Sequence, residues 1–390
     1  IEELYPDETF VRGDEENTIL HTPLELVPVP TPSGAITTTP PQKMERISTG
    51  DQVYVQQHLA SIDLGSDACR AALIYQGNLV CGNLNGELIT LDLQTGRMGR
   101  YNLIPRSAVV SAAWAMVIHG ERLLLHTGGK EWFEANPLSG QRTRSGTFPE
   151  PGLGLQIAGE WLYGIGGRKI YRWPASNPSG RYEEFNLPGR AAGPGVLQGS
   201  AYYIPTSVGV VRLSAGDNTL EPIGPPEPAR MILRLGGRRI AGIYPVISSD
   251  GSLNTRLRWF ECSSQMKLLG EITFSGQSIG LPQVADDWIL FAFQDGRLVG
   301  CQFQDNSLLE RWQTRISSGR SLQAGAAYGR GLLAAVAGHA GGGILTVLHA
   351  QKGEIIHEQP LMGDFLIAPI WWERNVILVN LAGSLEVSRI

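Results

Sequence analysis

The sequence has no long hydrophobic run and few cysteines. It contains no stretch of about eighteen uncharged apolar residues, which a membrane-crossing helix would need. We therefore predict no membrane span. The four cysteines, Cys69, Cys81, Cys262 and Cys301, form no CxxC pair, which argues against a zinc site and a dense disulfide framework. We expect these thiols to be reduced and buried.

Familiar catalytic and metal motifs are also missing. The seven histidines form no HExxH spacing, and the glycine-rich run at 164–169 lacks the Lys-Ser/Thr pair of a phosphate loop. We interpret those glycines as turn residues that adopt positive φ. The sequence thus predicts no catalytic, cofactor-binding or metal-binding residue and no cofactor. It favours a protein that is not an enzyme, with an enzyme of unfamiliar site composition as the alternative.

The charge is concentrated in the first 50 residues, which carry nine acidic and three basic side chains. The remainder is close to neutral and lacks the basic surface of a nucleic-acid binder, so no nucleic-acid partner is predicted. The Pro- and Thr-rich run at 26–43 is too poor in apolar residues to fold alone. We interpret residues 1–50 as an extended linker or tail, and a docking segment is the alternative.

The chain begins with Ile1 and shows neither the basic start nor the apolar run of a signal peptide. We expect it to be a piece of a larger, bacterial-type protein. The compartment stays open, with the cytoplasm favoured over the periplasm by the absent signal and the unpaired cysteines.

A repeat of about forty residues organises the rest of the chain. The count of 48 glycines and 24 prolines indicates many tight turns. The clearest unit, Ala72 to Ile104, divides into four short strands with turns at Gly77-Asn78, Asn85-Gly86 and Thr95-Gly96. Its layout recurs to give eight units, each the length of one four-stranded propeller blade. Their central turns fall near Asn85, Gly128, Gly166, Ser207, Asp250, Asp295, Gly341 and Ala382.

The last unit supplies three strands, because the chain ends at Ile390. We predict that Asp51–Leu64 supplies the fourth and closes the ring, which removes exposed sheet edges. The predicted fold is an all-β, eight-bladed β-propeller over residues 51–390, with seven blades as the alternative.

The string GELITLDLQTG at 86–96 resembles the repeat of the quinoprotein-type (PQQ-like) propeller family. The resemblance spans roughly residues 52–390 and is specific in the first, sixth and seventh units. The tryptophan that this family carries late in each blade has a counterpart at Trp312, and the first unit has Tyr101 there. Quinoprotein dehydrogenases also carry vicinal cysteines and calcium-ligating carboxylates, which this chain lacks. The resemblance therefore implies the non-enzymatic members, which act as assembly scaffolds or sensor modules. WD40-type propellers are a second possible relative, but the Trp-Asp pair that marks them is missing.

The candidate partner-binding residues are arginines and tryptophans. Arg230, Arg234, Arg238 and Arg239 form the densest basic group, and their spacing allows Arg230 and Arg234 to share one face of a strand. An acidic protein or an anion would suit a positive patch here, and solvated charges that discourage aggregation are the alternative. Further cations that could extend the patch are Arg142, Arg144, Arg168, Lys169 and Arg172.

Trp371 and Trp372 open the last unit and could anchor a partner if they lie in a turn. We expect a non-catalytic scaffold or sensor module whose partner is another protein or an adjacent domain of the same polypeptide. The rival hypothesis is a small-molecule or enzymatic site in the central channel.

Overall fold

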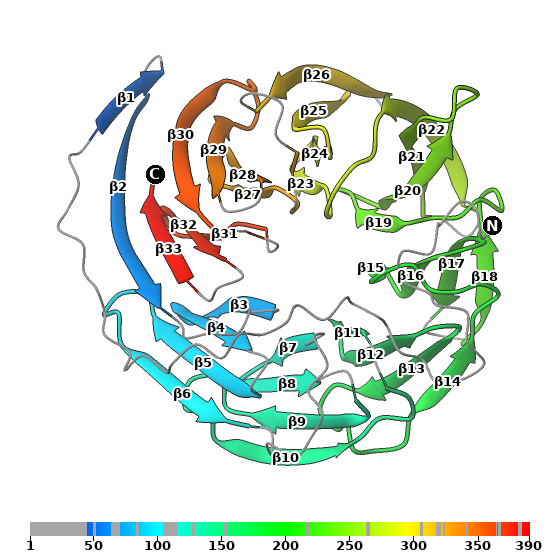
Figure 1. Cartoon of the computed structure of the whole chain (residues 1–390). Coiled ribbons are helices and arrows are strands. Elements are labelled where there is room, and N and C mark those ends of the chain that lie inside the picture. Colours follow the sequence, from blue (N-terminus) through cyan, green and yellow to red (C-terminus); the bar gives the residue numbers. More distant parts are fainter. Residues whose placement is uncertain are drawn as a thin grey trace.

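The structure of the chain is a computed structural model. It describes residues 45–49, 52–63, 71–82, 86–103, 115–126, 129–151, 154–214, 218–262, 266–304, 307–316, 321–322, 324–339, 342–363, 365, 368–380 and 384–390. Every regular element among them is a β-strand. The strands form eight antiparallel sheets arranged as blades around a centre (Figure 1). This confirms the predicted eight-bladed propeller.

The first seven blades each contain four strands that follow one another in the chain, with the first strand nearest the centre (Figure 1). Blade 1 comprises β3 (Ala71–Tyr75), β4 (Asn78–Gly82), β5 (Glu87–Asp92) and β6 (Met98–Asn102). Blade 2 comprises β7 (Ala115–His119), β8 (Arg122–His126), β9 (Glu131–Ala135) and β10 (Arg142–Thr147). Blade 3 comprises β11 (Gly154–Ala158), β12 (Trp161–Gly166), β13 (Lys169–Pro174) and β14 (Glu183–Asn186). Blade 4 comprises β15 (Val196–Gln198), β16 (Ala201–Thr206), β17 (Gly209–Ser214) and β18 (Leu220–Ile223).

The next three blades have the same plan, with longer third and fourth strands. Blade 5 comprises β19 (Met231–Arg234), β20 (Arg239–Ile247), β21 (Leu253–Glu261) and β22 (Lys267–Ser275). Blade 6 comprises β23 (Gln283–Ala285), β24 (Trp288–Ala292), β25 (Arg297–Gln304) and β26 (Ser307–Arg315). Blade 7 comprises β27 (Ala327–Gly329), β28 (Leu332–His339), β29 (Gly342–His349) and β30 (Ile355–Met362).

Blade 8 joins the two ends of the propeller. It comprises β31 (Ile370–Trp372), β32 (Asn375–Val379), β33 (Ser384–Arg389), β2 (Gln52–Asp63) and β1 (Glu45–Thr49). The strand β2 pairs antiparallel with β33, as Ile62 opposite Leu385 shows, and Figure 1 places β2 on the outer side of β33. The predicted closing strand is therefore confirmed. The extra strand β1 pairs with β2 and lies inside the range 1–50 that we interpreted as a tail; residues 1–44 lie outside the described part.

The apolar residues lie between the blades. In β24, Trp288, Leu290 and Ala292 face blade 7, whereas the alternating Ile289 and Phe291 face blade 5, because successive side chains of a strand point to opposite sides of the sheet. Buried residues form eight clusters, and each cluster joins two neighbouring blades. A ring of eight blades has eight interfaces and an open row has seven, so the clusters show that the ring is closed.

Aromatic side chains anchor two of these interfaces at equivalent places. The Trp312 Nε1 of blade 6 donates a hydrogen bond to the Ala350 carbonyl of blade 7 at 2.9 Å. In the same way the Tyr101 hydroxyl of blade 1 donates to the Leu138 carbonyl of blade 2 at 3.2 Å. Both rings pack on the glycine of the turn between the third and fourth strands, Gly353 and Gly140 respectively. The two residues that the repeat pattern singled out thus have one structural role.

The predicted central turns can be followed in half of the blades. Ser207, Asp250 and Asp295 lie between the second and third strands, and Gly166 is the last residue of β12. Asn85, Gly128, Gly341 and Ala382 lie outside the described residues. The three described cysteines, Cys81, Cys262 and Cys301, are free thiols, with Cys262 half-buried and the other two buried; Cys69 lies outside the described part.

Candidate binding sites at the two ends of the ring

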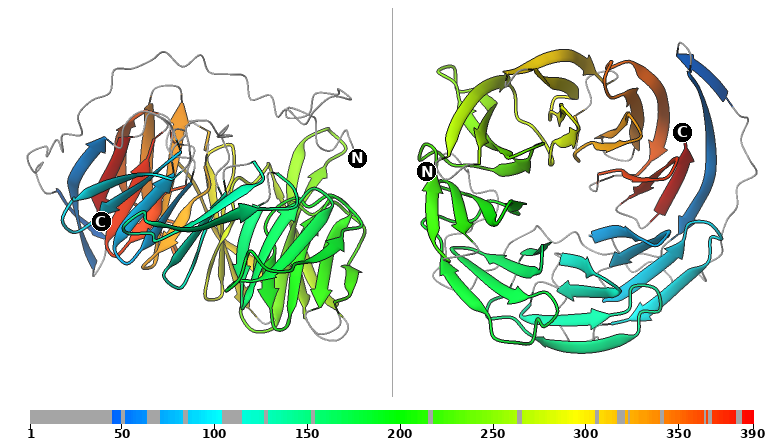
Figure 2. Two further views of the ribbon diagram at one scale, coloured as in Figure 1. Left: turned by 90° about the horizontal axis from the view of Figure 1, so that it is seen from below. Right: turned by 180° about the vertical axis from the view of Figure 1, so that it is seen from behind.

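The ring has two ends that differ in their connections. Strands of every blade run between these ends, as the side view in Figure 2 shows. We call one end the crossover face: it carries the connections between blades, such as 187–195, 224–230 and 276–282, and the turns between second and third strands. The opposite face carries the remaining two turns of each blade.

The four predicted arginines are divided between the two faces. Arg230 directly precedes β19, whereas Arg234 is its last residue, so the two are about 13 Å apart along the strand. Arg230 lies on the crossover face, where its Nη1 donates to the Ser278 carbonyl at 3.3 Å. Arg234, Arg238 and Arg239 lie in or beside the turn between β19 and β20 on the opposite face. A single patch containing all four is therefore not formed.

The three residues Arg234, Arg238 and Arg239 are called the arginine turn below. Arg234 and Arg238 are exposed and have no ion-pair partner within the described ranges. Arg239 is half-buried, with its guanidinium 5.1 Å from the centre of the Phe303 ring and its Nε donating to the Gly236 carbonyl. The Gln198 amide of blade 4 donates to the Gly237 carbonyl. Contacts with Gln198 of blade 4 and Phe303 of blade 6 thus hold the turn, while the side chains of Arg234 and Arg238 are exposed to solvent.

Trp371 and Trp372 lie in the strand β31 rather than in the turn that a partner anchor would need. Both are half-buried. Trp371 packs on Gly329 and its Nε1 donates to the Ala327 carbonyl of blade 7 at 2.9 Å. Trp372 belongs to the opposite interface, where it packs against the cluster shared with blade 1. The two indoles pack in the two interfaces that blade 8 forms with its neighbours. A role for them in partner binding stays a prediction.

The crossover face contains a cavity of about 310 Å³. It lies where the inner strand β11 of blade 3 meets the connection to blade 4. The lining residues are Gly154, Leu155, Gln156, Ile165, Gly167, Ala191, Ala192, Gly193 and Pro194. A Cβ added at Gly193 would lie 3.4 Å from the Arg230 carbonyl oxygen, so the backbone of the predicted Arg230 lies next to one lining residue but does not itself line the cavity.

The Gln156 amide fixes one wall of the cavity. Its Nε2 donates to the Gly195 carbonyl at 2.7 Å, and its Oε1 accepts a hydrogen bond from the Tyr202 hydroxyl. The Tyr202 ring stacks on Tyr163 with centroids 4.0 Å apart. Burial raises the pKa of Tyr202, so its hydroxyl stays protonated and can donate. Because the nitrogen and the oxygen of the Gln156 amide are both hydrogen-bonded within the fold, the cavity offers a ligand mainly apolar groups and backbone atoms.

Two exposed arginines stand next to lining residues. Arg168 follows Gly167, and Arg190 precedes Ala191. The Ala191 N–H donates to the Gly167 carbonyl at 2.8 Å, which holds the two arginine-bearing segments side by side. Arg168 has no ion-pair partner among the residues that the structure describes.

The other cations of the predicted patch do not join this site. Arg142 and Arg144 are exposed on the outer strand β10. Lys169 is paired with Glu184 at 2.8 Å. Arg172 is buried, where it binds Glu183 and lies 4.4 Å from the Trp161 ring centre.

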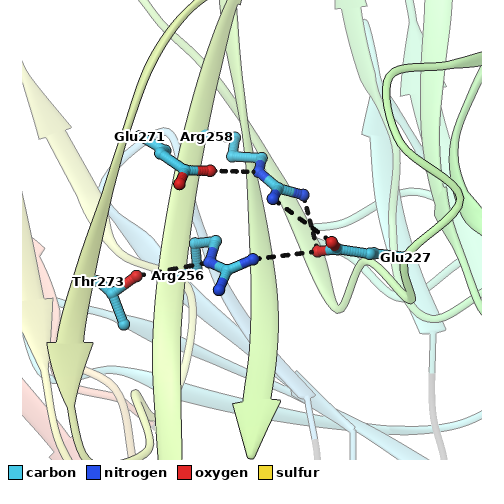
Figure 3. A network of polar contacts seen from close by, with 5 residues as sticks. All are labelled: Glu227, Arg256, Arg258, Glu271 and Thr273. Atoms are coloured by element: carbon cyan, nitrogen blue, oxygen red, sulfur yellow. Dashed lines mark hydrogen bonds and ion pairs between the residues drawn. The ribbon is translucent and has the colours of Figure 1, made fainter.

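A polar network that the sequence did not suggest joins the 224–230 connection to blade 5. Figure 3 shows Glu227 between Arg256 and Arg258, which both lie on β21. The Arg258 Nη1 donates to Glu227 at 2.7 Å, and its Nε donates to Glu271 at 2.8 Å. The bond from Arg258 lowers the pKa of Glu271. Since each charged group of the network has a partner of opposite charge, we interpret the network as a structural contact that fixes the 224–230 connection to blade 5.

One familiar catalytic motif is present after all, contrary to the sequence analysis: Gly276–Gly280, GQSIG, has the GxSxG spacing of a hydrolase nucleophile elbow, which exposes its serine between a strand and a helix. Here it connects β22 to β23, and Ser278 is buried. The Ser278 backbone is occupied at both groups: its N–H donates to Thr255 Oγ1 at 2.8 Å and its carbonyl accepts from Arg230. This geometry does not present a nucleophile.

Within the described ranges, no three or more His, Cys, Asp or Glu side chains gather so as to hold a metal ion. The part of the chain that the structure describes also contains no helix long and apolar enough to span a membrane.

The chain matches no protein-family model, and no curated protein is significantly similar to it. Its fold is similar to that of several solved structures. The computationally designed Ika8 protein is 12% identical with a TM-score of 0.62, over 84% of this chain and 99% of that one. BamB from Moraxella catarrhalis is 14% identical with a TM-score of 0.62, over 86% and 98% of the two chains. Sqt1 from Saccharomyces cerevisiae is 11% identical with a TM-score of 0.63, over 85% and 98%. These likenesses show a β-propeller fold.

Proposed function

We propose that this chain is a non-catalytic propeller that binds another protein, or an adjacent domain of its own polypeptide, as a scaffold or sensor module. The observation that carries the proposal is the arginine turn. Arg234 and Arg238 are exposed, have no carboxylate partner among the described residues, and project from a turn held by Gln198 and Phe303. Cations held in this way suit an acidic segment of a partner, because complementary charges speed association and fix register. In this proposal residues 51–390 form the binding module and residues 1–50 a linker, and the repeat is of the PQQ-like type.

The absence of an ion-pair partner among the described residues distinguishes this turn from several arginines elsewhere in the ring. Arg172, Arg212 and Arg258 each bind a glutamate of the next strand in their own blade. These three ion pairs are satisfied within the fold and leave little charge for a ligand. The arginine turn instead offers charge that no carboxylate of the described residues neutralises.

The test is affinity capture with the intact chain and with a variant that carries Arg234→Glu and Arg238→Glu. Partners that bind the turn should be lost from the reversed variant and weakened by salt, because exposed ion pairs are screened. Lys352→Glu is the matched control, since Lys352 is exposed in a turn on the same face. Equal capture by all three proteins would contradict the proposal.

The rival function, a small-molecule or enzymatic site in the central channel, makes a different prediction. A metabolite that binds the folded chain raises its Tm, and the stabilisation grows with the logarithm of the ratio of its concentration to Kd. Such a shift in a metabolite screen, with no protein captured, would favour the rival.

A further inference from the structure

We propose that the cavity on the crossover face receives one apolar side chain of an acidic partner segment, with Arg168 binding a carboxylate next to that side chain. This inference rests on the proposed function, because the ligand is a partner protein. It concerns the face opposite the arginine turn and names the chemistry that would be recognised there.

The size and lining of the cavity fit a single side chain. Its volume of about 310 Å³ is at the lower limit for small-molecule sites, which run from about 300 to 1,000 Å³. Its walls include Leu155, Ile165 and Pro194, and the amide of Gln156 is already hydrogen-bonded within the fold. An aliphatic or aromatic group therefore gains by entering, whereas a polar group would find few partners.

The charge beside the cavity selects what lies next to that side chain. Arg168 is exposed, follows the lining residue Gly167 and has no ion-pair partner among the described residues. Lys169 does not contribute, because Glu184 already binds it. Arginine binds carboxylates through paired N–H groups, so we expect Asp or Glu next to the apolar residue in the partner segment.

The glycines of the cavity allow a partner backbone to come close, and one of them allows a clean test. Gly154 is the first residue of β11, and a Cβ built on it meets no atom closer than the Ile165 carbonyl oxygen at 3.7 Å. Gly154→Leu should therefore fold normally while its side chain occupies the cavity. Gly342→Leu is the matched control, because Gly342 is likewise the first residue of a strand at the crossover face, and a Cβ built on it meets no atom closer than the Leu361 carbonyl oxygen at 3.6 Å.

The experiment measures fluorescence polarisation of a labelled pentapeptide of two glutamates, one leucine and two glutamates on the full chain. A second peptide replaces the leucine with serine. We expect the leucine peptide to bind about tenfold more tightly or better, as burial of one such side chain implies. Gly154→Leu should weaken the leucine peptide by about the same factor and leave the serine peptide unchanged. Arg168→Glu should weaken both peptides, while Gly342→Leu changes neither.

Several outcomes would overturn the inference. One is equal affinity for the leucine and serine peptides; another is an unchanged leucine-peptide affinity in Gly154→Leu and in Arg168→Glu. A third is saturable binding of hexanoate, lost in Gly154→Leu, with no binding of the peptide, which would assign the cavity to a small carboxylic acid. Failure here is separable from failure of the proposed function, because the Arg234→Glu, Arg238→Glu variant retains the cavity and is scored by capture of partners.

Discussion

At the scale of single residues, an aromatic side chain of one blade packs on a glycine in a turn of the next blade and so joins the two blades. Trp312 covers Gly353, and Tyr101 covers Gly140 in the equivalent turn of another blade. Both glycines have positive φ, 71° and 62°, a conformation that costs other residues about 1–2 kcal/mol. The same turn in blade 1 has Gly96 with φ 71° but no atom within 4 Å of an added Cβ. Comparing Gly353 and Gly140 with Gly96 therefore separates the free-energy cost of positive φ in a residue other than glycine from the cost of disturbing the aromatic contact.

We expect Gly353→Ala to destabilise the protein more than Gly96→Ala. Both variants suffer the backbone cost, but a Cβ at Gly353 would lie 2.6 Å from the Trp312 ring and displace the indole from its hydrogen bond to Ala350. Gly96→Ala should cost about 1 kcal/mol, and Gly353→Ala about 3 kcal/mol or more. Urea unfolding followed by tryptophan fluorescence measures both. Equal losses would show that the ring contact adds nothing.

The sequence singled out Trp312 and Tyr101 but predicted neither their contacts nor the candidate sites as they stand. Trp312 and Tyr101 were recognisable because their place in the repeat is fixed. Arg230 and Arg234 looked like one patch because their spacing puts them on one side of a strand, but β19 is a crossing strand whose two ends lie on different faces of the ring. The cavity was not predictable, since its lining comes from β11, a turn and a connection that the sequence pattern does not place relative to one another.

At the scale of elements, turn residues were enough to predict the strands, and sheet edges explain the arrangement of blade 8. A blade completed only by β31, β32 and β33 would leave β33 as an open edge that pairs with foreign strands. The strand β2 covers that edge, and β1 in turn pairs with β2. The sequence predicted β2 from the missing fourth strand. It did not predict β1, because an edge strand beyond a complete blade is not required by the repeat.

Two truncated chains distinguish the roles of these strands. A chain that begins at Gln52 lacks β1 and should lose at most about 1 kcal/mol, since four strands of blade 8 remain. A chain that begins at Ala71 also lacks β2, exposes β33, and should unfold at clearly lower urea and self-associate. Urea titration and size-exclusion chromatography compare the two with the intact chain. A stable monomer starting at Ala71 would show that β2 does not close the ring.

At the scale of the whole molecule, eight interfaces between neighbouring blades hold the ring together, and we expect the chain order to decide which of them forms last. Seven interfaces join blades that follow each other in sequence. The remaining contact, between blade 8 and blade 1, packs Ile377 and Val379 against Leu79 and Leu91. It adjoins the pairing of β2 with β33, which brings together positions more than 300 residues apart, such as Ile62 and Leu385. Closing so long a loop costs about 5 kcal/mol of chain entropy by the logarithmic estimate.

A permuted chain would test whether this closure limits folding. In the permutant, residues 71–390 are followed by a short Gly-Ser linker and then by residues 52–69, so that β33 and β2 become neighbours in sequence. The sheets stay the same, but the most distant pairing becomes local, and folding rates rise as contacts become more local. We expect refolding about tenfold faster in stopped-flow tryptophan fluorescence. We also expect faster hydrogen exchange at β3 and β31, because only side-chain packing then holds blade 8 to blade 1. An unchanged refolding rate would place the slow step inside the individual blades rather than at the closure of the ring.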